Sequence, residues 1–154
     1  MRTRLFATVS VALVAILLAT IGTVSLTGRG VGAQGAPTTV LTTTLTGAAE
    51  VPGPGDPDGT GQATLILLPE QGRLCYVLTA QGIAPATAAH VHAGRPGEAG
   101  PVAVTLEPPT WGASGGCVAA DPALLRAIAE DPAGYYVNVH NDEYPAGAIR
   151  GQLG

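Results

Sequence analysis

The three histidines of the chain have the clearest chemical potential, because their spacing allows them to act together. His90 and His92 flank Val91 in one apolar segment, and His140 follows Asn138 by two residues in another. Residues two apart on a β-strand share a face, so the two members of each pair project together. If the two strands are neighbours, three imidazoles converge on a patch of the sheet that faces away from the apolar interior. Such a set of ligands is typical of Zn(II) and Cu(II) sites.

The residues after His140 supply auxiliary candidates. Asp142 and Glu143 lie in the following turn, where either could provide a carboxylate ligand or an acceptor that orients a ligand, and Asn138 is a further auxiliary candidate. Metal-dependent catalysis would also require an open coordination position beside a pocket, and the sequence indicates none. It favours a non-enzymatic role. The competing interpretation is that the histidines are ordinary polar residues on the outer face of the sheet and bind no metal. The domain would then be an interaction module that binds an unknown protein or surface partner.

Short strands and frequent turns must position these residues, because glycine (22) and proline (13) are abundant and only 12% of residues are charged. An Asp-Pro start and apolar residues at helical spacing predict one short helix over residues 121–130. Turn signals about every 8–12 residues predict an all-β antiparallel Greek-key-like sandwich or barrel. The predicted strands cover residues 39–46, 61–68, 72–80, 86–93, 101–106, 134–140 and 148–153.

Two cysteines, Cys75 and Cys117, are the only ones in the chain. Both follow an export segment, and an oxidising compartment allows such a pair to form a stable disulfide. A disulfide over this span stabilises a small domain by about 3–4 kcal/mol through the unfolded state. The alternative, a pair of metal-ligating thiolates, lacks the close spacing that such sites show.

The first 33 residues have the pattern of an export signal. Arg2 and Arg4 precede an uncharged apolar run over residues 5–26, and Val31-Gly-Ala33 offers a small-residue cleavage site. Because the run also approaches the length that spans a bilayer, an uncleaved membrane anchor is the alternative to a signal peptide. We predict that residues 34–44 form a tether and the start of the first strand. Residues 45–154 are predicted to form the β domain. Either way the domain is secreted or extracytoplasmic, and it contacts a membrane only through residues 5–26 if they are retained.

The charge of the exported part excludes one class of partner. All basic residues are arginines, and without Arg2, Arg4 and Arg29 four arginines remain against 11 acidic residues, a net charge of −7. Nucleic acids bind positively charged surfaces, so we expect no nucleic-acid partner.

Several short motifs in a fixed order resemble the CHRD domain, a module first described as a repeat in chordin and also found in many bacterial exported proteins. The resemblance implies a compact extracellular β domain. The placement of Glu50 is similar to that in the family and implies a structural ion pair with Arg150, which lies on the face opposite Ile149 and Leu153. The motifs are Leu45-Thr-Gly-Ala-Ala-Glu-Val-Pro52, Gly59-Thr-Gly-Gln-Ala63, Ala89-His-Val-His-Ala-Gly94, Gly100-Pro-Val-Ala-Val104, and His140 with Tyr144-Pro-Ala-Gly-Ala-Ile-Arg-Gly-Gln-Leu153.

Overall fold

Residues 38–154 are described by a computed structural model, and the predicted signal or anchor over residues 1–33 lies outside them. The described chain forms one eight-stranded sheet in the order β5-β4-β7-β8-β1-β2-β3-β6, in which every pairing is antiparallel. Among residues 38–154, no helical segment has the length and hydropathy of a membrane-spanning helix. The strands are β1 (Thr39–Thr46), β2 (Thr60–Leu68), β3 (Arg73–Gln81), β4 (Ala88–Ala93), β5 (Val102–Leu106), β6 (Ala113–Ala119), β7 (Tyr135–His140) and β8 (Ile149–Gln152).

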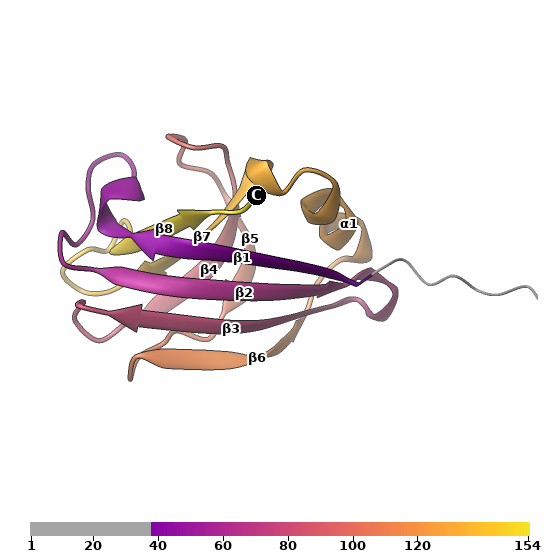
Figure 1. Ribbon diagram of the computed structural model, residues 1–154, viewed down its shortest axis with the longest axis horizontal. Coiled ribbons are helices and arrows are strands. Elements are labelled where there is room, and N and C mark those ends of the chain that lie inside the picture. Colours follow the sequence, from indigo (N-terminus) through magenta and orange to yellow (C-terminus); the bar gives the residue numbers. More distant parts are fainter. Residues whose placement is uncertain (1–37) are drawn as a thin grey trace, which may run out of the picture. The chain divides into compact units, whose positions relative to one another are not determined.

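The sheet curls into a nearly closed barrel, which confirms the predicted fold class. In Figure 1, β1, β2, β3 and β6 lie in front, with β4, β5 and β7 behind them. Hydrogen bonds link the segment after β5 to the far end of the sheet: the Glu107 amide donates to the Tyr76 hydroxyl at 2.8 Å, and the Ser114 hydroxyl donates to the Glu107 carbonyl at 2.7 Å. These bonds bring the two edges of the sheet toward each other.

The interior is filled by alternate residues of the strands, as the period of two requires. In β2 the buried positions are Ala63, Leu65 and Leu67, and Val91 in β4 and Val137 in β7 are also fully buried. These side chains belong to a single hydrophobic cluster. The valines between and beside the predicted metal-ligating positions therefore face the core, and the histidine positions face outward.

The predicted helix is present as α1 (Pro122–Glu130). The Asp121 carboxylate accepts a hydrogen bond from the Ala123 amide at 2.7 Å, which satisfies one of the free amides at the helix start. Leu125 and Ile128 are fully buried against the core. Short 3₁₀ turns occupy Gly47–Ala49, Pro69–Gln71 and Pro132–Gly134.

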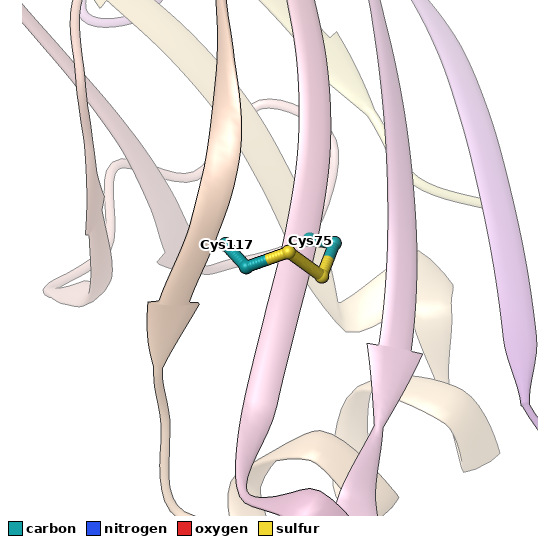
Figure 2. Close-up of a disulfide and its surroundings, with 2 residues drawn as sticks. All are labelled: Cys75 and Cys117. Carbon is teal, nitrogen blue, oxygen red and sulfur yellow. A yellow bond between two sulfur atoms is a disulfide. The ribbon is translucent and has the colours of Figure 1, made fainter.

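Strand β6 is not among the predicted strands, although it carries one of the two cysteines. Its Gly115 and Gly116 lower the intrinsic strand propensity, so the sequence pattern is weak there. The strand forms because it pairs along the edge of β3, with Cys75 directly opposite Cys117. These residues form a disulfide that ties the two strands together (Figure 2).

Candidate metal centre

Strands β4 and β7 are neighbours and bring the three histidines together on the outer face of the sheet. In the register His90 lies opposite Asn138, His92 opposite Tyr136 and Ala88 opposite His140. One donor atom from each imidazole lies within 4.8 Å of the others. The ring centroids are 5.1 Å apart for His90 and His140, 5.4 Å for His90 and His92, and 6.3 Å for His92 and His140.

Two backbone carbonyls fix where the imidazole protons lie. Nδ1 of His92 is 2.8 Å from the carbonyl oxygen of Gly100, and Nδ1 of His140 is 3.1 Å from that of Pro145. A carbonyl oxygen can only accept a hydrogen bond, so each Nδ1 must donate its proton to it. A neutral ring then carries a lone pair on Nε2. Metal-binding histidines are commonly oriented by such contacts.

A cation would provide a partner for the lone pairs on Nε2 of His92 and Nε2 of His140. Nε2 of His92 is buried and has no hydrogen-bond partner. Nε2 of His140 lies 3.1 Å from Nδ1 of His90 and 3.1 Å from Oδ1 of Asn138. A proton on His90 can satisfy one of these contacts, but the lone pair of His92 remains without a donor.

The spacing of the nitrogens suits one ion. Two nitrogens bound at 2.0–2.1 Å are about 3.3 Å apart in a tetrahedral site and about 2.8 Å apart at neighbouring corners of a square site. The 3.1 Å between His90 and His140 falls between these values. The 4.8 Å limit on the other separations exceeds these values and is nearer the roughly 4.1 Å between opposite corners of a square site, so the rings must move together to bind one ion at 2.0–2.1 Å.

The side chain of His92 is only 8% exposed, although strand parity places it on the outer face. The segment from Gly94 to Gly100 covers it, and its ring stacks on Tyr136 with centroids 4.9 Å apart and an angle of 7° between the planes. The Tyr136 hydroxyl in turn accepts a hydrogen bond from the Gly100 amide at 3.1 Å. The histidine pattern did not single out Tyr136, although parity puts it on the same face as Asn138 and His140.

A buried arginine supports this arrangement from the other side of Tyr136. The Arg150 guanidinium lies 3.4 Å from the centroid of the Tyr136 ring and donates to the carbonyls of Glu98 at 2.8 Å and Arg95 at 2.9 Å. Glu50 and Arg150, the predicted structural ion pair, attract each other but do not come within 4.0 Å. In the described part of the chain the ion pairs within 4.0 Å are Arg95–Asp131 and Arg126–Glu70. Through its hydrogen bonds to Glu98 and Arg95, Arg150 instead links the segment from Gly94 to Gly100 to β8.

The remaining candidate residues lie at different distances from the cluster. Asn138 is 2% exposed and contacts His140 directly. Asp142 and Glu143 are exposed in the turn after β7 and are not part of the group of donor atoms. The described donor set is therefore three imidazoles with one carboxamide beside them.

Burial of the cluster favours neutral imidazoles. Desolvation lowers the pKa of His90, and repulsion from His140 and His92 lowers it further. Desolvation also lowers the pKa of His140 despite the opposing effect of its hydrogen bond to Pro145. Neutral rings are the form in which histidines bind metal ions.

Glu50 is a second buried titratable group, and burial raises its pKa from 4.5 to about 7, although the attraction of Arg150 and a hydrogen bond from the Val51 backbone oppose the shift. The folded protein therefore holds this proton more tightly than the unfolded chain does. The resulting stabilisation is fully present below about pH 4.5 and is lost as the pH rises through about 7.

Replacement Glu50→Gln should remove this pH dependence. Between pH 5 and pH 8 the unfolding free energy of the unmodified protein should fall by on the order of 2–3 kcal/mol more than that of the variant. Urea denaturation of both proteins at the two pH values measures the difference, and titrations of all other groups cancel in the comparison. Equal changes in the two proteins would show that Glu50 has an ordinary pKa.

Comparison with known proteins gives one match. A family model described as the CHRD domain matches residues 41–153, which is most of the chain. Neither a curated protein nor a solved structure matches the chain significantly.

Proposed function

We propose that this chain, which belongs to the CHRD domain family, is an exported domain that binds one Zn(II) or Cu(II) ion through His90, His92 and His140. The observation that carries the proposal is the buried Nε2 of His92, which has no hydrogen-bond partner although its Nδ1 is committed to Gly100. A buried lone pair without a donor is unfavourable, and a metal ion would satisfy it.

The neighbouring residues support the same interpretation. His140 is oriented by the Pro145 carbonyl, so two of the three rings have their proton-bearing nitrogens held away from the lone pairs. Asn138 Oδ1 lies beside Nε2 of His140 and would serve as an additional oxygen ligand or as an acceptor next to the ion. The bound ion would supply a positive charge at the outer face of β4 and β7.

Without a metal the same residues would form a small hydrogen-bonded patch on an exported interaction module. His90 would donate to His140, and rotation of the Asn138 amide would place its NH₂ group, rather than its oxygen, next to His140. The single lone pair of His140 Nε2 then has a donor, but His92 Nε2 still has none. This atom favours the metal-binding function over the metal-free one.

Export is supported by the N-terminal segment with its two arginines and by the disulfide, which persists in an oxidising compartment. Fractionation of cells that express the full chain would test it. Recovery of the protein with an intact disulfide outside the cytoplasm is expected, and retention in the cytoplasm as free thiols would contradict export.

Calorimetric titration of the purified domain with Zn(II) or Cu(II) tests the proposed function. We expect one ion per chain. Cu(II) should bind more tightly than Zn(II), because nitrogen ligands generally have a higher affinity for Cu(II). Absence of saturable binding would contradict the proposal.

The same titration at pH 7.5 and pH 6.5 tests the state of the rings. Two imidazoles of ordinary pKa would be half protonated at pH 6.5, which would weaken binding by about threefold relative to pH 7.5. Because the pKa values of His90 and His140 are lowered, we expect a smaller change than this. A loss of about threefold or more would show that these rings titrate as exposed ones do.

A further inference from the structure

A cavity of about 280 Å³ lies between the segment after β1 and the turn that joins β7 to β8. Its walls are largely apolar and include Val51, Pro52, Pro54, Tyr144 and Pro145. Its charged lining residues are Glu50 and Glu143, both acidic. The volume is close to the lower end of the usual range for small-ligand sites, about 300 Å³, and suits a ligand the size of one side chain.

Glu50 lines this cavity. Glu50 is 6% exposed, and its Oε1 is buried without a hydrogen-bond partner. Gly147, another lining residue, packs so closely on the carboxyl group that a methyl group there would overlap all three of its terminal atoms. The backbone at Gly147 therefore leaves room for the carboxyl group, one oxygen of which is buried without a donor.

The charges around Glu50 leave that oxygen unsatisfied. Arg150 attracts Glu50 but directs its hydrogen bonds to the carbonyls of Arg95 and Glu98 and to the side chain of Gln152. Arg150 and Glu50 both line a second cavity of about 290 Å³. On the side of the first cavity the facing titratable groups are Glu143 and Tyr144, and neither is a cation.

We propose that the first cavity binds a primary alkylammonium group, with the cationic head on Glu50 and the alkyl stem against the proline and tyrosine walls. One unpartnered oxygen suits a compact ammonium better than the two-pronged guanidinium group of arginine. The chain contains no lysine, so no side chain of a second copy supplies the ligand. The source is a free amine or a lysine side chain of another protein.

Binding should depend on pH through Glu50. The ammonium group pairs with the ionised carboxylate, and the raised pKa of about 7 means that this form dominates only above neutrality. Affinity should therefore be about tenfold higher at pH 8 than at pH 6, a range over which an alkylamine stays protonated.

An NMR titration of the folded domain with n-pentylamine tests the proposal, with 1-pentanol as the uncharged ligand of similar size. We expect the amine to shift resonances of Val51, Tyr144 and Gly147 and to bind at least about tenfold more weakly to Glu50→Gln. The variant Glu143→Gln removes an exposed charge and should lose only about twofold to fivefold. Equal binding of pentanol and pentylamine, unchanged binding by Glu50→Gln, or no binding of the amine would overturn the proposal.

Two further ligands separate the sources of the ammonium group. Tighter binding of Nα-acetyl-lysine methylamide than of pentylamine would indicate a lysine of a partner protein, whereas the reverse order would indicate a free amine. The proposal is independent of the metal centre: His92→Ala should bind pentylamine as the unmodified protein does, and a loss of amine binding in that variant would contradict a separate site. Unchanged circular dichroism of Glu50→Gln confirms that the variant folds.

Discussion

Replacement of His92 by alanine should weaken Zn(II) binding by at least about a hundredfold. Loss of a residue that only supports a metal ligand already costs about 10–100-fold in affinity, and His92 is placed as a ligand itself. It is also the ring whose lone pair is buried without a partner, so its removal eliminates the donor that most needs the ion. Competition of each protein with a chelator of known zinc affinity measures the change.

A matched control is available on β2, which lies three positions from β7 in the order of the sheet. Gln62 is exposed on β2, and Gln62→Ala should bind zinc as the unmodified protein does. His90→Ala and His140→Ala should weaken binding as His92→Ala does, because all three donors share one ion. Similar affinities of His92→Ala and the Gln62→Ala control would show that the ion binds elsewhere on the protein.

Removal of the disulfide should lower the unfolding free energy by about 4 kcal/mol. The two cysteines are separated by 42 residues, and closing a loop of this length restricts the unfolded chain by about that amount. The bridge also joins β6 to β3, and β6 pairs with no strand other than β3 in the described sheet. Urea denaturation of the double variant Cys75→Ala/Cys117→Ala measures the loss.

The unmodified protein under reducing conditions is the matched control, because it loses the bridge but keeps both side chains. Cys117 is exposed and Cys75 only partly buried, so the alanines remove little packing. We therefore expect the reduced protein and the double variant to be destabilised to a similar degree. A difference of less than about 1 kcal/mol between the oxidised protein and both of these would contradict a stabilising role for the bridge.

The shared face of the histidines within each strand could be anticipated because it depends on local rules. Strand parity alone places His90 and His92 on one face, and the buried Val91 and Val137 show which face points inward. The pairing of β4 with β7 was a condition of the prediction and could not be derived from it, because nothing in either segment specifies its neighbour. The structure meets that condition.

Features that depend on distant packing were missed. Strand β6 contains Gly115 and Gly116 and forms only because the edge of β3 is available to it. Similarly, the sequence around Arg150 indicates a charge but not its partners, which are backbone carbonyls of a covering segment more than 50 residues away. The sequence of side chains does not indicate which backbone carbonyls a side chain will contact. The stack of His92, Tyr136 and Arg150 could therefore not be predicted from the sequence.

X-ray absorption spectroscopy of the domain loaded with one equivalent of Zn(II) or Cu(II) tests the metal centre most directly. The proposed site predicts scattering from three imidazoles, with metal–nitrogen distances of about 2.0–2.1 Å. A spectrum dominated by oxygen ligands, with one imidazole or none, would contradict the proposed centre.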